Sequence, residues 1–485
     1  MITPTRRAAL AGLLATTLAP RLEAAKTPVT KASLHALLDR AAALPPRVGR
    51  ALLDPVDPAA LDESARLDLL TARAGLACDA ALATIGAPGR SPYRVSARTG
   101  IWQRATDPAA IDAEREAVVA DAKRGVMLPR AALDDTVAAI HARVAAPAVT
   151  AALQRLAGAL AALREQAPPP GMLHLPHGPA WYALLLRRHG VAVSPVAADR
   201  LLAREEARLM TRAQALFAAR GDRNGVLGDR YRRLWRDARY HYPDDVRGRA
   251  AAVDDMNGVL ATIRATLRGI VPDVPSWPLD VAVRGMTASE LAAGVQGFRQ
   301  LPTPTASGAY VVDLRRIAAR PRWTLPSVVA HELLPGHLLQ MPLEASRPPH
   351  PLRLEYAVGF PEGWAIHAEE MAATAGWLGD DPLVALGHLH WLLFRVSRAR
   401  ADLAIHWRGT PIPEVRQRFE QLLGEPAYFI DFATDIGRIL VEPGIRVAEA
   451  TSWLSIRERM AQQPEGLIPF LRAGRRRDED LHAAV

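Results

Sequence analysis

The sequence predicts a mainly α-helical protein, a large helical body with a small antiparallel β-sheet beside the candidate active-site helix. Alanine, leucine and arginine are abundant, and aromatic residues make up only 5% of the chain, a composition that favours helix over sheet. Apolar residues recur at helical spacing through most of the 485 residues. Only two short segments, 279–283 and 309–313, are rich in β-prone residues, and proline and glycine separate them.

The first 25 residues have the pattern of a signal peptide. Arg6 and Arg7 precede an apolar run at 8–19, and small residues follow at 24–25. Paired arginines at this position are typical of twin-arginine export. The run is too short to span a bilayer as a stable helix, and no other stretch reaches about 18 apolar residues without charge. We therefore expect an exported, periplasmic protein without stable membrane insertion.

Helices are expected in succession after this leader. Residues 30–165 have amphipathic helical spacing, and the stretch 168–171, Pro-Pro-Pro-Gly, is the clearest linker-like punctuation. Ser194 is expected to cap a helix that runs from Pro195 to Phe217. Another helix is expected at about 250–267.

Near residue 270 the sequence changes from helical spacing to short β-prone segments. This change divides the chain into an N-terminal helical region, 30–270, and a candidate catalytic region, 271–485. The second region begins with the two β-prone segments and continues with helices expected to open at Pro326 and Pro361. Helical spacing then continues to the C-terminus, with a break at Pro443.

Charge and cysteine content exclude several classes of function. The formal net charge of +9 comes from arginines spread along the chain, without basic runs that alternate with stacking aromatics, so nucleic-acid binding is not expected. Cys78 is the only cysteine, which excludes an intramolecular disulfide and a zinc site built from several cysteines.

The segment 331–337, His-Glu-Leu-Leu-Pro-Gly-His, carries the strongest chemical signal. Zinc takes imidazole and carboxylate ligands, and a glutamate that follows the first histidine can act as general base toward water, the role expected of Glu332. His331 and His337 are six residues apart, which on a regular helix is about 600° of rotation and leaves them roughly 120° apart. A break at Pro335-Gly336 would be needed to bring them together. The alternative is a helix that ends there and carries two ordinary polar histidines.

A third ligand is offered by the helix expected at Pro361. Glu362 and Glu369 are seven residues apart and so share one face of a largely apolar helix. Two carboxylates buried on one face need a cation or hydrogen-bond donors. Glu362 as a zinc ligand, with Glu369 hydrogen-bonded behind the ligands, would satisfy both. The alternative for Glu369 is that it faces solvent.

These residues resemble the bacterial family known as domain of unknown function 885. The resemblance covers most of the chain after the leader, and it is carried by His-Glu-x-x-Pro-Gly-His, Glu-Gly-Trp-Ala and several separate positions. The matching positions outside segment 331–337 are Gly178, Tyr182, Gln340, Glu362, Gly363, Trp364, Ala365, Glu369, Arg398, Asp402, His406, Asp435, Arg438, Pro443 and Gly444. The resemblance implies a gluzincin-like metallopeptidase fold with zinc held by His331, His337 and Glu362, and with Glu332 as base.

The chain departs from the family pattern at several positions. Leu338 replaces a histidine and His367 replaces a tyrosine, and Ile445 and Glu449 replace the family's glutamine and tyrosine after Pro-Gly. If that glutamine and tyrosine help to bind substrate or to stabilise the oxyanion, this chain must do so differently or not at all.

The remaining candidates for that electrophilic role are His406 and Arg438. The alternative for both is structural support: Arg438 would pair with a carboxylate, and His406 lies one turn from Asp402. Asp402 and His367, like Glu369, are expected to support the ligands from behind.

The function expected from these features is hydrolysis of a peptide bond in a short substrate by a zinc metallopeptidase. The same machinery would serve a zinc-dependent esterase or an amidase acting on non-peptide amides. A third possibility is a catalytically inactive, exported helical binding protein that keeps the fold, an interpretation motivated by the departures at Leu338, Ile445 and Glu449. The expected partner is a small peptide or another small molecule, and the oligomeric state stays open.

Overall fold

The computed structural model describes residues 31–482 except 87–90, 428 and 464–465, and the prediction of a mainly α-helical fold is confirmed. The candidate signal peptide, residues 1–25, lies outside the described residues. Within the described ranges, no helix combines the length and the apolar character needed to cross a membrane.

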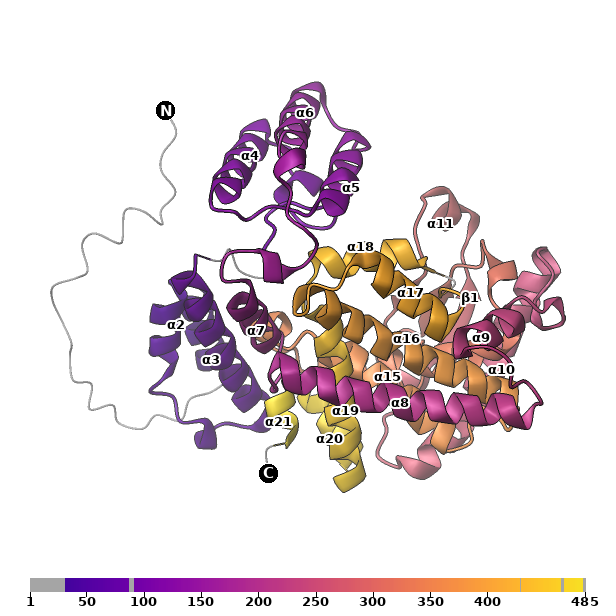
Figure 1. Cartoon of the computed structure of the whole chain (residues 1–485). Helices are drawn as coiled ribbons and strands as arrows, with labels where there is room; N and C mark the ends of the chain where they lie inside the picture. Colours follow the sequence, from indigo (N-terminus) through magenta and orange to yellow (C-terminus); the bar gives the residue numbers. More distant parts are fainter. Residues whose placement is uncertain (1–30, 87–90, 428, 464–465, 483–485) are drawn as a thin grey trace.

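The N-terminal third forms two helical groups with separate cores. Helices α1 (Lys31–Ala43), α2 (Pro46–Leu53) and α3 (Glu63–Thr84) pack around a small cluster of leucines and alanines. Helices α4 (Pro108–Lys123), α5 (Arg130–His141) and α6 (Pro147–Ala161) enclose a second cluster that includes Trp102. In Figure 1 this second group stands apart at the top of the molecule.

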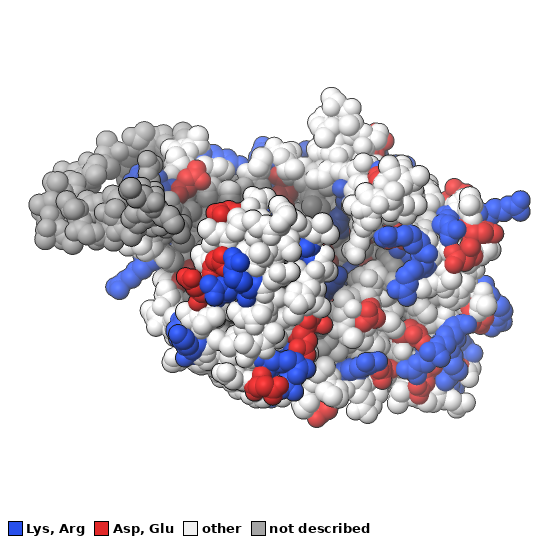
Figure 2. Space-filling model, turned by 90° about the horizontal axis from the view of Figure 1, so that it is seen from above, with Lys and Arg blue, Asp and Glu red and all other residues white. Residues whose placement is uncertain are grey.

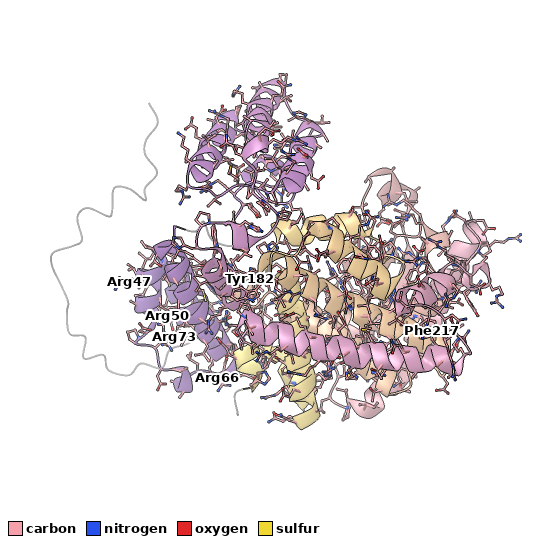
Figure 3. The ribbon with its side chains drawn as sticks, in the orientation of Figure 1. Arg47, Arg50, Arg66, Arg73, Tyr182 and Phe217 are labelled. Carbon is pink, nitrogen blue, oxygen red and sulfur yellow. The ribbon has the colours of Figure 1, made fainter. Side chains whose placement is uncertain are left out.

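The main body has a single large core to which helices before and after residue 270 contribute. It begins with α7 (Gly178–Arg188), α8 (Pro195–Ala219), α9 (Leu227–Trp235) and α10 (Val246–Ile270). The predicted cap is confirmed, because the Ser194 hydroxyl accepts a hydrogen bond from the amide of Ala197 at the start of α8. In Figure 3 the labelled Tyr182 and Phe217 mark α7 and the far end of α8.

The remaining helices follow residue 270, and several of them form the candidate site. They are α11 (Ala288–Ala292), α12 (Leu325–Glu332), α13 (His337–Ala345), α14 (Pro351–Tyr356), α15 (Phe360–Thr374), α16 (Pro382–His406), α17 (Ile412–Leu423), α18 (Phe432–Val441), α19 (Ile445–Gln462), α20 (Leu467–Ala473) and α21 (Asp478–His482). Single 3₁₀ turns lie at Pro58–Ala60, Ile101–Gln103, Arg164–Gln166, Met172–His174, Ala238–Tyr240, Trp277–Leu279, Ile317–Ala319 and Arg322–Thr324. Helix α16 is buried along most of its length and packs against α8, α12, α17 and α19, so its side chains reach the site from the centre of the body.

The sheet corrects one prediction. It has three strands in the order β1 (Val281–Gly285), β3 (Gly308–Val312) and β2 (Phe298–Gln300). The two predicted strands, β1 and β3, pair in parallel rather than antiparallel. Parallel neighbours need a crossover, and here α11 and β2 occupy the connection. The unpredicted β2, only three residues long, pairs antiparallel on the other side of β3.

Candidate metal centre

A four-residue break between α12 and α13 brings the two histidines of the motif together. Helix α12 ends at Glu332 and α13 begins at His337. A Cβ atom on Gly336 would lie 1.9 Å from the carbonyl oxygen of His331, so this close approach admits only glycine. The indole of Trp364 donates a hydrogen bond of 2.9 Å to the carbonyl of Pro335 and holds the break against α15. As a result the rings of His331 and His337 lie 4.9 Å apart.

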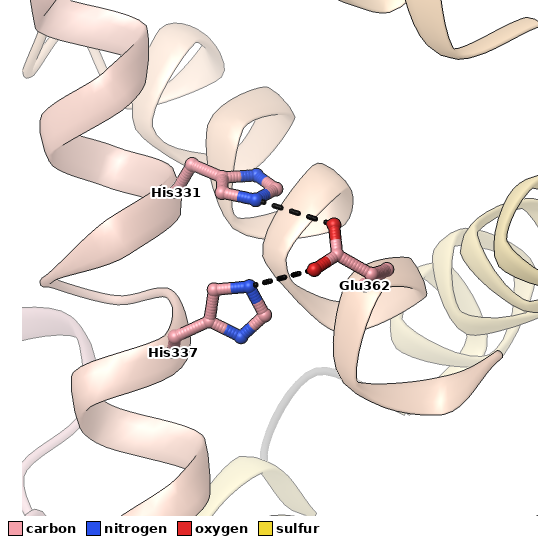
Figure 4. Close-up of side chains that lie close together, drawn as sticks. All are labelled: His331, His337 and Glu362. Carbon is pink, nitrogen blue, oxygen red and sulfur yellow. Dashed lines mark ion pairs between the residues drawn. The ribbon is translucent and has the colours of Figure 1, made fainter. Parts of the chain in front are cut away.

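Glu362 on α15 completes a triad with these histidines (Figure 4). Its two carboxylate oxygens lie 3.4 Å from His331 Nε2 and 3.3 Å from His337 Nε2. One ligand atom from each residue lies within 4.8 Å of the others. Both histidines are buried, whereas Glu362 is 30% exposed, so the triad is open on the glutamate side.

The protonation of the triad fits a site for a cation. Burial lowers the pKa of His337 to about 4, which leaves a neutral ring. Its Nε2 faces Glu362 at 3.3 Å, and its buried Nδ1 has no hydrogen-bond partner among the described residues. Burial and Arg395 oppose protonation of His331, but Glu362 and Glu369 raise its pKa to about 9. Burial also opposes ionisation of Glu362, yet the two histidines hold its pKa well below the usual range. A divalent cation bound by Nε2 of both histidines and by Glu362 would take the place of the proton on His331, so the donor set fits zinc.

Glu369 supports His331 from behind. Its Oε1 accepts a hydrogen bond of 2.8 Å from His331 Nδ1, which directs Nε2 of the same ring toward Glu362. Both side chains are buried. His388 on α16 lies 4.0 Å from the other Glu369 oxygen and is within 3.1 Å of the Ser327 hydroxyl. His388 carries no signal in the sequence, because its place beside Glu369 depends on how α16 packs against α15.

Glu332 lines the same cavity as His331 and Glu362. One of its carboxylate oxygens accepts a hydrogen bond of 2.7 Å from the guanidinium of Arg299 on β2. Arg299 carries no signal in the sequence, because a three-residue strand leaves no usable alternation pattern. Arg299 holds the carboxylate of Glu332 at the cavity wall.

The cavity has a volume of about 590 Å³ and is lined only by residues that follow 271. Eight arginines and four carboxylates line it, so its wall is strongly cationic. In Figure 2 a hollow opens on the upper face, with basic side chains along its wall. The arginines are Arg299, Arg315, Arg316, Arg320, Arg395, Arg398, Arg438 and Arg446.

Arg395 is the cavity arginine that contacts the triad. One of its nitrogens lies 3.3 Å from His331 Nε2 and the other lies 3.6 Å from a Glu362 oxygen. The residue stands one helical turn before Arg398 on α16, and that spacing is the sequence signal that would have pointed to it.

The structure places His406 and Asp402 away from the cavity, which corrects the roles expected of them. Asp402 accepts hydrogen bonds from the Tyr182 hydroxyl and from the amide of Gly444. Nδ1 of His406 accepts a hydrogen bond from the amide of Met172, and its Nε2 donates a hydrogen bond to the carbonyl of Ile439. Along α16 these two residues lie roughly 10 and 16 Å beyond Arg395. They join helices within the core and do not contact the triad.

His367 also lies outside the cavity wall. It is five residues after Glu362 on α15, so it points to another face of that helix. Its ring packs edge-on against Trp364 at 5.7 Å, and burial lowers its pKa to about 4. The support expected of His367 is therefore packing beside Trp364, not a bond to the ligands.

The contacts of His406 predict a pH effect on stability. Burial lowers its pKa to about 4. Protonation of Nδ1 would place two hydrogen-bond donors, the ring N–H and the Met172 amide, face to face without an acceptor. Because the folded-state pKa lies below the unfolded value, this stabilisation is present above about pH 6.5 and is lost as the pH falls toward 4. Between pH 7 and 5 the loss is about 2 kcal/mol.

We expect His406→Gln to remove this part of the pH dependence. Urea unfolding of the wild type and of the variant at pH 7 and pH 5 measures it. Equal slopes of unfolding free energy against pH in the two proteins would contradict the prediction.

Two of the departures from the family pattern have clear places. Leu338 is fully buried in the apolar core. Glu449 lines the cavity, where it pairs with Arg446 and lies 3.9 Å from Arg398. The position at which the family carries tyrosine is therefore a carboxylate in this cavity wall.

Comparisons with known proteins extend the likeness beyond the motifs. The family model described as "Bacterial protein of unknown function (DUF885)" matches residues 16–463. The chain is similar to the crystal structure titled "putative lipoprotein from Colwellia psychrerythraea", with a TM-score of 0.75 and 19% identity over 93% of this chain and 88% of the other. It is also similar to a structure titled "a putative lipoprotein of unknown function from Shewanella oneidensis", with a TM-score of 0.63 and 15% identity over 94% and 92%. A search of curated proteins found no match.

Proposed function

The chain belongs to the bacterial DUF885 family, and from the geometry of its site we propose that it is a zinc-dependent hydrolase, most specifically a metallopeptidase that cleaves short peptides. The single observation that carries this proposal is the convergence of His331, His337 and Glu362 within 4.8 Å, with His331 and Glu362 at the wall of a cavity of about 590 Å³. When bound there, zinc would supply Lewis acidity that polarises a carbonyl and makes water more acidic.

Glu332 is the general base of the proposed reaction. Its carboxylate faces the same cavity as the triad and follows His331 directly in the chain, so it is within reach of water held next to His331 and Glu362. The Arg299 guanidinium orients this carboxylate through the 2.7 Å hydrogen bond. After taking a proton from water, Glu332 would pass it to the leaving amine.

Arg395 supplies the positive group for the developing oxyanion. It already lies within 3.6 Å of both His331 and Glu362, and a guanidinium can donate two parallel hydrogen bonds to a substrate oxygen. This assignment replaces His406, whose ring nitrogens are both engaged by backbone groups.

The alternatives differ in the bond that is cleaved or in whether any bond is cleaved. An ester or a non-peptide amide would use the same triad and base. Burying the Glu369 carboxylate costs free energy, and an inactive binding protein gives no reason for that cost. Support of His331 as a metal ligand through their hydrogen bond does give a reason. Both structural relatives are titled as lipoproteins, which agrees with the proposal that this protein is exported and acts in the periplasm.

Metal analysis and a substrate panel test the proposed function. We expect the purified protein, after incubation with zinc and dialysis, to hold about one equivalent, and His337→Ala to hold far less. His241→Ala is the matched control, because His241 lies outside the triad and bonds to the Ala318 and Trp235 carbonyls. A peptide library and an esterase panel then identify the bond. Zinc far below one equivalent, or no turnover on either panel, would contradict the proposal.

A further inference from the structure

The cavity wall beyond the triad carries more positive charge than its own carboxylates neutralise. Arg299 is paired with Glu332 and Arg315 with Asp313. Arg438 on α18 differs from these arginines. Among the described residues its side chain makes no hydrogen bond or ion pair, although its Nε atom is buried.

The carboxylates near Arg438 are already engaged by other arginines. Asp435, one turn earlier on α18, accepts hydrogen bonds of 3.0 and 2.9 Å from Nε of Arg398. Glu442, one turn later, pairs with Arg98 at 2.7 Å and with Arg446 at 2.9 Å.

Glu449, which lines the cavity, is also engaged. It pairs with Arg446 and lies 3.9 Å from Arg398. Among the described residues, Asp435, Glu442 and Glu449 are therefore all paired with other arginines, and a buried guanidinium nitrogen without a partner is costly.

We propose that Arg438 binds a carboxylate of the substrate. This inference rests on the proposed function, which gives the substrate as a short peptide. It adds that this peptide bears a carboxylate on the part that reaches Arg438. A guanidinium binds a carboxylate through two parallel hydrogen bonds, and the surrounding arginines Arg398 and Arg446 add to the attraction.

The position of Arg438 sets which carboxylate fits. Arg395 contacts the triad, and Arg398 lies one turn further along α16. Arg398 pairs with Asp435 on α18, and Arg438 lies one turn after Asp435 on the same helix. Arg438 lines the same cavity as His331 and Glu362, so a peptide cleaved at the triad can place a carboxylate at Arg438 within that cavity. The C-terminal carboxylate of the leaving segment meets this condition, and so does an acidic side chain at the same place.

Three peptides distinguish these sources: tetra-alanine, tetra-alanine amide, and Ala-Ala-Ala-Glu amide. With the zinc-loaded enzyme we expect kcat/KM to be at least tenfold higher for tetra-alanine than for its amide. Recovery of that rate by the Glu-bearing amide would assign the contact to a side chain, whereas no recovery would assign it to the C-terminus. Equal rates for all three peptides would overturn the proposal.

Variants locate the contact at Arg438. Arg438→Gln should raise KM for the preferred peptide at least tenfold and bring the acid and the amide within about twofold of each other, at an unchanged zinc content. Arg438→Lys should keep part of the preference, because it keeps the charge and loses the paired donors. Arg416→Gln on the exposed face of α17, which makes the same change in charge, should behave as the wild type. A preference that persists in Arg438→Gln would overturn the proposal.

Calorimetry of the metal-free protein separates this inference from the proposed function. Tetra-alanine should bind more tightly than its amide to the wild type, and equally to Arg438→Gln. Preferential binding of the acid without hydrolysis of any peptide would contradict the metallopeptidase and leave the carboxylate site standing. Hydrolysis without such a preference, or no binding of either peptide, would contradict the carboxylate site.

Discussion

Replacing Glu332 with glutamine is expected to lower kcat by about two to four orders of magnitude while zinc stays bound at one equivalent. Glutamine has the shape of glutamate and keeps an oxygen that can accept the hydrogen bond from Arg299. It cannot take a proton from water. The triad is untouched, because His331, His337 and Glu362 supply the ligands without Glu332.

Zinc content and turnover on the same peptide, measured side by side, test this expectation. Glu420→Gln on the exposed face of α17 is the matched control, since it removes one carboxylate whose only ion pair within the described part of the chain is with Arg416. Unchanged turnover in Glu332→Gln would remove Glu332 from the role of base. Loss of zinc in that variant would mean that Glu332 is itself a ligand.

The convergence of the triad and the place of Glu332 beside it could be predicted because their signals are local in the sequence. His331 and Glu332 are adjacent, and the seven-residue spacing of Glu362 and Glu369 places both on one face of a helix. The hydrogen bond from His331 to Glu369 is the contact that this spacing implies.

The roles of Asp402 and His406 could not be read from the same kind of signal. Their spacing shows that they share a face of α16, but a 25-residue helix crosses the whole body, and the sequence does not say which of its turns meets the site. The structure puts Arg395 there and leaves Asp402 and His406 among α7, α18 and α19. Arg299 was hidden for the opposite reason, because its strand is too short to show a period.

The sheet illustrates the same limit. Alternation and composition locate β1 and β3 correctly, because both signals lie within five consecutive residues. Whether they pair in parallel depends on the path of the chain between them, and that path includes β2 and α11. The direction in which β1 and β3 pair depends on the segment that connects them, and the residue pattern of that segment does not reveal its path.

The second large effect is expected at Gly336, where a single methyl group should abolish tight zinc binding. In Gly336→Ala the new Cβ would lie 1.9 Å from the carbonyl oxygen of His331 and 2.4 Å from that of Ala330, both of them backbone atoms. Neither can move without distorting the end of α12. Relief must therefore come from the four-residue break, which would carry His337 away from His331 and Glu362. We expect zinc affinity to fall by more than about a hundredfold, beyond the loss typical of altered support around a ligand.

Gly258→Ala on α10 is the matched control, because among the described residues no heavy atom beyond its own stretch of helix backbone lies within 4 Å of its added Cβ. Alanine favours helix over glycine, so this variant should bind zinc as the wild type does and unfold at an equal or higher urea concentration. Competition with a chromogenic chelator measures zinc affinity, and circular dichroism shows whether Gly336→Ala keeps its helices. A folded Gly336→Ala protein with wild-type zinc affinity would contradict the geometry. The six-residue spacing of the histidines would then have to be reconciled with zinc binding by some path other than the break between α12 and α13, because a regular helix leaves the two rings roughly 120° apart.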